Sequence, residues 1–383
     1  MNEPHIDKTG WKEYRFDEVC RQVNEATKDP TAEGVDHVIG LEHIEPNNLH
    51  IAQWDTLEKE TTFTRKFKKG QVLFGRRRAY QRKVAYAEFD GICSGDILVF
   101  EAIEKVMLPE LLPFVIQSEG FFQKALETSA GSLSPRTKFK ELADYEFLLP
   151  PKPEQKCTAA LLWAADEMVE MEKKQLAKLK EYYESYLQDS IDSSKYNSNL
   201  QDCIDGLIGG GTPNTKNGDY YNELEGTPWV TSISLEPIFI EKGERLITPL
   251  GIKLSATNVL PEGNIILGTR VGVGKCSINK VDMCFSQDST GIIIKKDIVN
   301  PVFLLFTLRS YQCQKYFKSH SRGTTIQGIT KEDLLGLPLW IPKQQQQLII
   351  ANKCVEIVNN INTSNILLEQ SQRIKQELIN KVF

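Results

Sequence analysis

The sequence is short of the features that mark exported, membrane-bound or disulfide-stabilised proteins. It contains no apolar run of about 18 residues or more, so no segment predicts a membrane-spanning helix. Its first residues, Met1-Asn2-Glu3-Pro4-His5, are too polar to begin a signal peptide. The eight cysteines are scattered without a Cys-x-x-Cys pair, which favours reduced, packed thiols. We therefore expect a cytoplasmic protein that makes no contact with a membrane.

Common catalytic signatures are also missing. The sequence has no Gly-x-Ser-x-Gly elbow and no Asn/Asp-Pro-Pro-Tyr tetrad for amino-group methylation. Residues 268–276 invite comparison with a phosphate-binding loop, but five residues separate Gly268 from Gly274, where that motif has four. Cys276 also stands where a Mg²⁺-binding serine or threonine belongs. We therefore predict no nucleotide site and no catalytic residue.

Metal and nuclease sites are not indicated either. His37, His43 and His50 are unequally spaced, and no cysteine completes a ligand set around them. Glu-x-Lys triplets such as 154–156 arise by chance in a chain of which 25% is charged. Residues 209–213, Gly-Gly-Gly-Thr-Pro, predict a turn, and they are weak evidence for phosphate binding. We predict no metal site.

One strongly basic run stands out from an acidic chain. The net charge is -5, which argues against a protein coated in positive charge but leaves room for local patches. Between residues 59 and 83 only Glu60 opposes the basic side chains, and four aromatic residues are interleaved with them. The basic residues of this run are Lys59, Arg65, Lys66, Lys68, Lys69, Arg76, Arg77, Arg78, Arg82 and Lys83. A solvated charged face and a footprint for nucleic-acid phosphates are both compatible with this pattern.

The sequence also contains an internal repeat. Residues 69–77 resemble residues 262–270, and residues 140–155 resemble residues 331–346, at offsets of about 193 and about 191. Strands are predicted at 38–41, 72–74, 83–86 and 96–100 in the first copy, and at 265–267 and 291–294 in the second. Helices are predicted at 109–126 and 301–317. The repeat predicts two α+β units with mixed sheets, which suggests a protein that reads two similar but non-identical targets.

Each copy ends in a stretch that predicts a long helix. Over 154–188, Leu162, Val169, Leu176 and Tyr183 recur every seven residues, and Ala165, Glu172, Leu179 and Tyr186 follow each by three. Such a helix is about 52 Å long and needs a partner. Over 344–383 the series is Cys354, Ile361 and Leu368 with Ile350, Ile357 and Leu378, interrupted by Ser364, Ser371 and Lys375. The interruption predicts a stutter or a further protein partner. Antiparallel packing of the two helices is the simplest arrangement, and dimerisation through each helix is the alternative.

These patterns predict five segments. They are a first globular domain over 1–150, a long helix over 151–190, a polar linker over 191–199, a second domain over 200–342 and a second long helix over 343–383. Residues 129–136 and 321–328 close the two domains with small hydroxyl residues and glycine. We expect these two segments to pack against their own domain, although such residues could also approach a phosphate.

In this arrangement the chain resembles the specificity (S) subunit of type I restriction–modification enzymes. The resemblance covers nearly the whole chain, and it rests on the repeat and on four motifs. These are Gly-Thr-Thr-Ile-Gln-Gly-Ile at 323–329, Leu-Pro-Leu-Trp-Ile-Pro at 337–342, Pro-Pro-Lys-Pro-Glu-Gln at 150–155 and Gly-Gly-Thr-Pro at 210–213. The first copy departs from the pattern, because an arginine-rich segment at 76–83 replaces the glycine-rich loop.

The resemblance implies a non-catalytic subunit that binds double-stranded DNA. Each domain would be a target-recognition domain for half of a bipartite sequence, and the helices would form an antiparallel coiled coil that sets the spacer. Two modification (methyltransferase) subunits would bring S-adenosylmethionine, and restriction subunits, if present, ATP and Mg²⁺. Arginine can bind guanine and glutamine adenine. The candidate DNA-binding residues are Lys66, Lys68, Lys69, Arg76, Arg77, Arg78, Tyr80, Gln81, Arg82, Lys83, Thr269, Arg270, Lys275 and Arg322. The candidate seam residues are Leu162, Val169, Leu176, Leu179, Tyr183, Ile357, Ile361, Leu368 and Leu378.

Two other classes of function stay open. A fused nuclease or methyltransferase fragment is disfavoured by the missing motifs, and a coiled-coil scaffold without a DNA role is disfavoured by the basic run.

Overall fold

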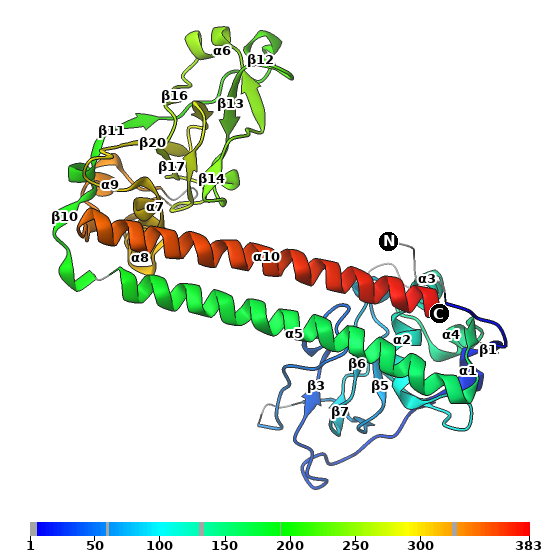
Figure 1. The fold of residues 1–383 in the computed structure, drawn as a ribbon. Helices are drawn as coiled ribbons and strands as arrows, with labels where there is room; N and C mark the ends of the chain where they lie inside the picture. Colours follow the sequence, from blue (N-terminus) through cyan, green and yellow to red (C-terminus); the bar gives the residue numbers. More distant parts are fainter. Residues whose placement is uncertain (1–5, 59–60, 130–133, 192, 324–327) are drawn as a thin grey trace. The chain divides into compact units, whose positions relative to one another are not determined.

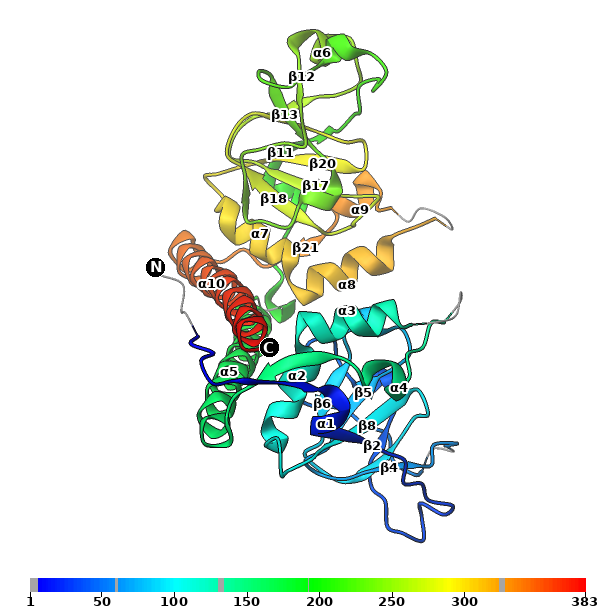
Figure 2. The same cartoon turned by 90° about the vertical axis from the view of Figure 1, so that its right-hand side faces the viewer.

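The computed structural model describes residues 6–58, 61–129, 134–191, 193–323 and 328–383. The chain forms two compact units, shown as ribbons in Figures 1 and 2. Unit 1 comprises residues 1–173 and 366–383, and unit 2 comprises residues 174–365. Each of the two long helices therefore contributes one part to each unit.

Unit 1 is built on two sheets. The larger one has the order β2-β8-β5-β6 with antiparallel neighbours, and the smaller one has the order β3-β7-β4, in which β3 is parallel to β7. A further pair joins β1 to β9. The strands are β1 (Lys12–Arg15), β2 (Cys20–Val23), β3 (Val38–Ile39), β4 (Arg65–Phe67), β5 (Val72–Gly75), β6 (Val84–Tyr86), β7 (Gly91–Cys93), β8 (Ile97–Ala102) and β9 (Glu146–Leu149).

Alternation along the strands decides which layer each side chain enters. Val72 and Phe74 of β5 pack with the helices, whereas Leu73 between them packs against the smaller sheet. In β8, Phe100 points to the helices and Val99 to the smaller sheet. Successive side chains of a strand point to opposite faces, so a continuous apolar run fills two core layers at once.

Unit 2 repeats this topology with a larger second sheet. Its orders are β11-β20-β17-β18-β14 and β12-β15-β13-β19-β16, and β13 is parallel to β19 as β3 is to β7. A pair of β10 and β21 matches the pair of β1 and β9. The strands are β10 (Ser198–Asn199), β11 (Ile204–Gly209), β12 (Tyr221–Asn222), β13 (Thr227–Val230), β14 (Phe239–Ile240), β15 (Arg245–Ile247), β16 (Val259–Leu260), β17 (Ile265–Gly268), β18 (Cys276–Asn279), β19 (Met283–Phe285), β20 (Ser289–Ile294) and β21 (Pro338–Leu339).

Short helices cover one face of each larger sheet. In unit 2, α7 and α8 lie on one side of β17 and β18, and β12 and β13 lie on the other (Figures 1 and 2). The short helices are α1 (Phe16–Val19), α2 (Leu112–Gln117), α3 (Glu119–Glu127), α4 (Phe139–Leu142), α6 (Pro249–Lys253), α7 (Pro301–Arg309), α8 (Tyr311–His320) and α9 (Lys331–Leu335). The 3-10 turns are η1 (Leu41–His43), η2 (Ala79–Gln81), η3 (Pro109–Leu111), η4 (Ser193–Lys195), η5 (Leu200–Cys203), η6 (Gly218–Tyr220) and η7 (Ser232–Ser234).

The single helices predicted over 109–126 and 301–317 are wrong in the same way. Each is broken by a serine with extended backbone, Ser118 between α2 and α3 and Ser310 between α7 and α8. Each serine hydroxyl accepts the backbone N–H of the residue three positions on, so it caps a new helix that points elsewhere. The strand predicted over 38–41 ends at Ile39, because the chain turns into η1.

The two long helices are α5 (Lys152–Ser190) and α10 (Gln344–Val382), each of 39 residues. In unit 1, Leu162 of α5 and Ile379 of α10 belong to one apolar core. In unit 2, Leu187 of α5 and Cys354 of α10 belong to another. The first part of α5 thus meets the last part of α10 in unit 1, and the reverse holds in unit 2.

Burial along these helices refines the predicted seam. Of the candidate seam residues, Leu162, Val169, Leu176 and Ile357 are buried, and Leu179, Tyr183, Ile361, Leu368 and Leu378 are half-buried. On α5 the fourth residue after Leu162 is buried, not the third, which brings Asp166 into the seam. On α10 Ser364, Ser371 and Lys375 are buried, and with the half-buried Ile361 and Leu368 they follow a three- and four-residue spacing, so the predicted stutter does not occur in this stretch.

Candidate nucleic-acid interface

The arginine-rich loop between β5 and β6 is held tightly by its backbone. The amide of Arg76 donates to the carbonyl of Asp96 at 3.0 Å, and the amide of Arg78 donates to the carbonyl of Pro135 at 2.9 Å. Arg78 and Arg82 flank the turn η2 with left-handed backbone, at φ 54° and φ 51°. Residues with a Cβ carbon adopt this conformation at a cost of about 1–2 kcal/mol. Such strain is typical of functional loops.

Most of the basic side chains in this loop are bound within unit 1. Arg77 and Arg136 both bind the carboxylate of Asp96, at 3.3 Å and 2.7 Å. The hydrogen bond from Arg136 and then the charges nearby hold the pKa of Asp96 below its ordinary value. Arg82 contacts both carboxylate oxygens of Glu119, and its guanidinium lies 4.9 Å from the ring centre of Phe122.

Four other members of the run are also bound, two to acids and two to backbone carbonyls. Lys66 binds Glu33, which raises the pKa of the lysine, and Lys68 lies 3.4 Å from Glu25. Lys83 donates to the carbonyl of Leu41, and Arg65 donates to that of Ile97. The run is therefore not opposed by Glu60 alone, because the fold brings acids from distant parts of the chain to it. Lys59 and Glu60 themselves lie outside the described residues.

Three side chains are left facing outward. Among the described residues, Arg78, Tyr80 and Lys69 have no side-chain hydrogen bond or ion pair, and the exposed fraction of Tyr80 is 57%. Arg76 is half-buried, and its Nε has no partner in the described part of the chain. Burial, and then the charge of Arg65, lower the pKa of Arg76. Gln81 is half-buried on the same turn.

Unit 2 builds its corresponding loop with the same backbone contacts. The amides of Thr269 and Arg270 donate to the carbonyl of Asp288 at 2.8 Å and 3.1 Å, as Arg76 donates to Asp96 in unit 1. The amide of Ile329 donates to the carbonyl of Thr269, as Thr137 does to Arg76. Here the left-handed residues of the loop are Gly272 and Gly274, which adopt this backbone without the strain that Arg78 and Arg82 carry in unit 1.

The side chains of this second loop differ from those of the first. Thr269 is buried, with its hydroxyl 3.2 Å from that of Thr290. Lys275 binds Glu236 at 2.6 Å. Arg322 binds Asp333 at 3.1 Å, although 72% of its side chain is exposed. Arg270 is exposed, and nothing in the described ranges binds its guanidinium.

Asp96 and Arg136 order the first loop, and neither was among the candidate residues predicted from the sequence. The sequence did contain a signal for Arg136, because this residue lies in the segment that closes the first domain. Of the two closing segments, 130–133 and 324–327 lie outside the described residues. The described parts next to them pack against the loops. Arg136 forms a β-bridge with Arg77, and Ile329, which directly follows the second segment, donates its backbone N–H to the carbonyl of Thr269.

The glycines of the Gly-Gly-Thr-Pro motif have a packing role. A Cβ carbon on Gly210 would lie 2.1 Å from the carbonyl oxygen of Ser286, and one on Gly211 would lie 2.3 Å from that of Ala256. Both positions therefore need glycine so that two backbone segments can approach closely.

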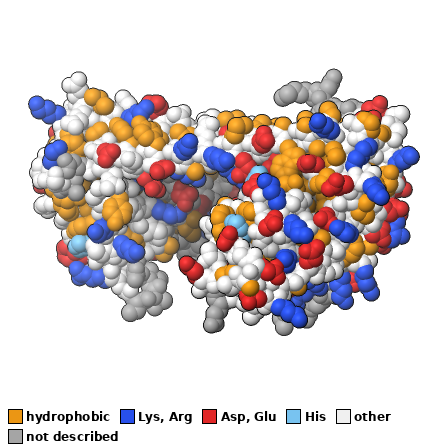
Figure 3. Space-filling model, turned by 90° about the horizontal axis from the view of Figure 1, so that it is seen from below, with side chains coloured by type: hydrophobic (Ala, Val, Ile, Leu, Met, Phe, Trp, Pro, Cys, Tyr) orange, Lys and Arg blue, Asp and Glu red, His pale blue; other side chains and the backbone are white. Residues whose placement is uncertain are grey.

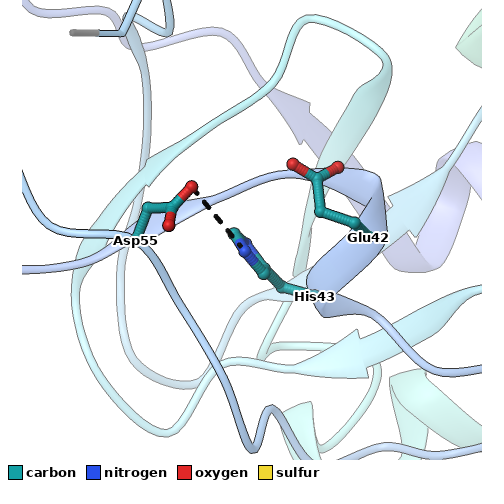
Figure 4. A group of neighbouring side chains, drawn as sticks. All are labelled: Glu42, His43 and Asp55. Carbon is teal, nitrogen blue, oxygen red and sulfur yellow. Dashed lines mark ion pairs between the residues drawn. The ribbon is translucent and has the colours of Figure 1, made fainter. Parts of the chain in front are cut away.

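One group of side chains has metal-like composition. Figure 4 shows Glu42 and His43 on one short turn, with Asp55 approaching from a neighbouring segment. The Nδ1 of His43 accepts the backbone N–H of Gly40 at 3.0 Å, so a neutral ring carries its proton on Nε2, which faces Asp55 at 3.9 Å. A protonated Nε2 cannot bind a metal ion, and the group does not amount to a metal site.

Charge is mixed on one face of the protein. On the face drawn in Figure 3, lysine and arginine side chains are interspersed with aspartate and glutamate side chains. Among the described helices, none has both the length and the apolar character needed to cross a bilayer.

Comparison with known proteins finds relatives over both units. The model of the type I restriction modification DNA specificity domain matches residues 8–181 and 198–376. The MjaIX type I restriction enzyme specificity subunit of Methanocaldococcus jannaschii is 29% identical over 171 residues, which are 43% of this chain and 39% of that protein. The match thus spans about two fifths of that relative's length.

Solved structures share the fold along the whole chain. One comes from a study of complex assembly and conformational transition of the type I R-M system, with a TM-score of 0.63, 18% identity and coverage of 99% of both chains. Another is the S subunit of a type I restriction–modification system from M. genitalium, with a TM-score of 0.62, 12% identity and coverage of 98% of this chain and 96% of that one. At these identities the likeness concerns the fold. Because the family model matches most of the chain, in two successive segments, this protein belongs to the family of type I restriction modification DNA specificity domains.

Proposed function

We propose that this chain is the recognition subunit of a type I restriction–modification complex and that each globular unit reads one half of a bipartite DNA target. The observation that carries the proposal is the duplicated loop architecture. Arg76 and Thr269 make equivalent backbone contacts in the two units, while the side chains around them differ. A shared framework with different side chains suits two related half-sites of different sequence.

The contacting residues of unit 1 are those that its own acids leave available. Arg78 and Tyr80 stand on an anchored, left-handed turn, which holds them in place before DNA arrives. Arginine binds guanine or phosphate through two parallel hydrogen bonds, and tyrosine offers a ring and a hydroxyl. Arg77, Arg82, Lys66 and Lys83 would then support the loop instead of reading bases.

In unit 2 the corresponding role falls to Arg270. Lys275 is bound to the exposed carboxylate of Glu236, and such a pair is weak enough for phosphate to replace it. Arg322 binds Asp333, whose side chain is only 17% exposed, while 72% of the arginine side chain remains exposed to a ligand. Thr269 is buried and supports the loop. The two units would thus contact DNA through different numbers of charged groups.

The two long helices are the spacer element of the proposal. We infer that α5 and α10 form an antiparallel coiled coil, and 39 residues of α-helix extend about 58 Å. That length is roughly 17 base pairs of DNA at a rise of 3.4 Å. The helices would also offer docking surfaces to two modification subunits. Those subunits would supply S-adenosylmethionine, and restriction subunits, if present, ATP and Mg²⁺. We place the complex in the cytoplasm and assign no catalytic step to this chain.

The domain boundaries follow from the same proposal. Recognition domains at 1–150 and 200–342 alternate with spacer helices at 151–190 and 343–383, and a polar linker at 191–199 joins the halves. Because the helices belong to both compact units, each recognition domain is continuous with one end of the spacer.

Methylation-site sequencing of DNA from cells with and without this chain tests the proposal. The expected result is one bipartite motif, methylated only when the chain and its modification subunits are present. A motif that persists without the chain, or methylation by the purified chain alone, would contradict it. A scaffold without a DNA role would show no salt-dependent DNA binding, either alone or with modification subunits.

A further inference from the structure

A buried charge cluster joins three separate segments of unit 1. Asp166 of α5 forms an ion pair with Lys375 of α10, and their side chains are only 2% and 7% exposed. The other oxygen of Asp166 lies 2.8 Å from the Nε2 of His50, which belongs to the globular part. The Nδ1 of His50 lies 2.9 Å from Glu88. A ring that donates to two carboxylates carries both protons, so the cluster balances two negative charges with two positive ones.

The pair interrupts an apolar seam. Leu162 precedes Asp166 by one helical turn, Val169 follows it at three residues, and both are buried. On α10, Ile379 is buried one turn beyond Lys375. An apolar pair of similar volume would pack here at least as well, so the charges do not serve stability best. Buried polar groups in helix seams are best attested as devices that select one register.

The equivalent positions on the described helices of unit 2 do not carry this charge pair. The buried residues Gln155 and Gln347 occupy equivalent positions in the repeat, which sets its offset here at 347 - 155 = 192. The same offset pairs Asp166 with Val358 and Lys375 with Tyr183. An aliphatic and an aromatic residue pack in several registers without leaving a charge unpaired. At these equivalent positions of the described helices, the charges that discriminate between registers lie in unit 1.

We propose that the Asp166–Lys375 pair fixes the register of α5 against α10 and thereby determines the spacer length that the recognition complex accepts. The inference rests on the proposed function. If α10 slid by one heptad, Asp166 would meet Leu368 or Val382, and a carboxylate would be buried without a cation. Such a state carries a large free-energy penalty, so the slipped registers are excluded. One heptad is about 10 Å of helix, or roughly three base pairs.

His50 extends the same constraint to the globular part of unit 1. Because it binds the carboxylate that binds Lys375, the recognition domain and α10 are positioned on α5 by one side chain. Asp166, Lys375 and His50 act as positioning residues and touch no DNA in this proposal.

The test compares the full chain with the double variant Asp166→Leu/Lys375→Leu, which removes both charges and leaves none unpaired. Spin labels replace Leu161 and Ile366, two exposed positions on the facing helices of unit 1, in a Cys157→Ser background. The same proteins, assembled with modification subunits, methylate a library in which the spacer of the target varies base pair by base pair. The single variant Asp166→Leu, which strands a buried lysine, serves as the folding control.

For the parent chain we expect one narrow label distance and one accepted spacer. For the double variant we expect an added population displaced by about 10 Å and methylation of targets roughly three base pairs longer or shorter. A single unchanged distance in a folded double variant overturns the inference. A broadened distance with an unchanged spacer overturns its link to specificity. If the parent complex itself methylates no bipartite target, the proposed function fails, and the label distances alone decide whether the pair sets the register.

Discussion

Gln155 and Gln347 make the same three hydrogen bonds at the start of the two long helices. Each is 1% exposed, and each side-chain oxygen accepts one backbone N–H while the amide nitrogen donates to two carbonyls. The partners are Leu108, Val106 and Pro150 for Gln155, and Asn300, Ile298 and Pro342 for Gln347. A buried amide that is satisfied in this way fixes the direction in which a helix leaves its domain.

Replacing either glutamine by leucine should destabilise its own unit. Gln155→Leu leaves one buried and two partly buried backbone hydrogen bonds unmade, and an unpaired buried group costs about 1–3 kcal/mol. The unfolding midpoint in urea should fall for Gln155→Leu and Gln347→Leu alike. Gln345→Leu, at an exposed position on the same helix, is the matched control and should leave the midpoint unchanged. If Gln155→Leu and Gln347→Leu lowered the unfolding midpoint no more than Gln345→Leu does, the proposed role of the hydrogen bonds would be contradicted.

Removing Arg78 and Tyr80 should damage recognition of one half-site only. The double variant Arg78→Ala/Tyr80→Ala loses contacts worth about 1–3 kcal/mol per base, or roughly 5- to 150-fold in affinity. DNA binding by the complex, measured over a range of salt concentrations, should weaken with a shallower salt dependence. Arg82→Ala is the comparison, because it breaks the pair with Glu119 and should lower stability more than recognition. Equal loss at both half-sites would count against two separate readers.

The left-handed backbone at Arg78 predicts that substitutions there change stability and DNA binding separately. Arg78→Gly should be more stable than Arg78→Ala by about 1 kcal/mol, since glycine adopts φ 54° without a clash. Both variants should lose the same DNA contact. Thermal unfolding and DNA binding of the two variants measure the two effects separately, and alanine as stable as glycine would show that the turn is unstrained.

The cluster around His50 makes stability depend on pH. Its hydrogen bond to Asp166 is the main cause that raises the pKa of His50 from 6.5 to about 9. A raised pKa means that the contribution to stability is complete below pH about 6.5 and is lost as the pH rises through about 9. The free energy of unfolding of the parent chain, measured in urea, should therefore fall between these pH values relative to that of His50→Gln. Parallel pH profiles for the two proteins would contradict the charged histidine.

Shortening the spacer helices should change the accepted target. Deleting residues 176–182 of α5 together with residues 359–365 of α10 removes one facing heptad and about 10 Å of length. Methylation should move to targets whose spacer is roughly three base pairs shorter, or the complex should fail to assemble. An assembled complex that keeps its original spacer would exclude a ruler made of these helices.

Local sequence patterns were sufficient to predict the elements whose apolar pattern is unambiguous. The predicted strands at 72–74 and 265–267 correspond to β5 and β17, because continuous apolar runs of that length are typical of buried strands. The helix breaks at Ser118 and Ser310 escaped prediction, since a capping serine inside an apolar pattern resembles an ordinary helical residue. The predicted seam on α5 included Ala165 instead of the buried Asp166 for a similar reason, because a polar residue is not expected in an apolar seam.

What the sequence determined by itself was the duplication, the two long helices and the residue types available to each loop. Repeats and heptads are properties of spacing along the chain, and they need no knowledge of distant partners. Only the tertiary structure decided which charges remain available. Glu25, Glu33, Asp96 and Glu119 are remote in sequence from the basic residues that they bind, so a one-signed run became a mostly neutralised surface with Arg78 and Tyr80 left outward. Charge pairing depends on distances in space, and the fold alone sets those.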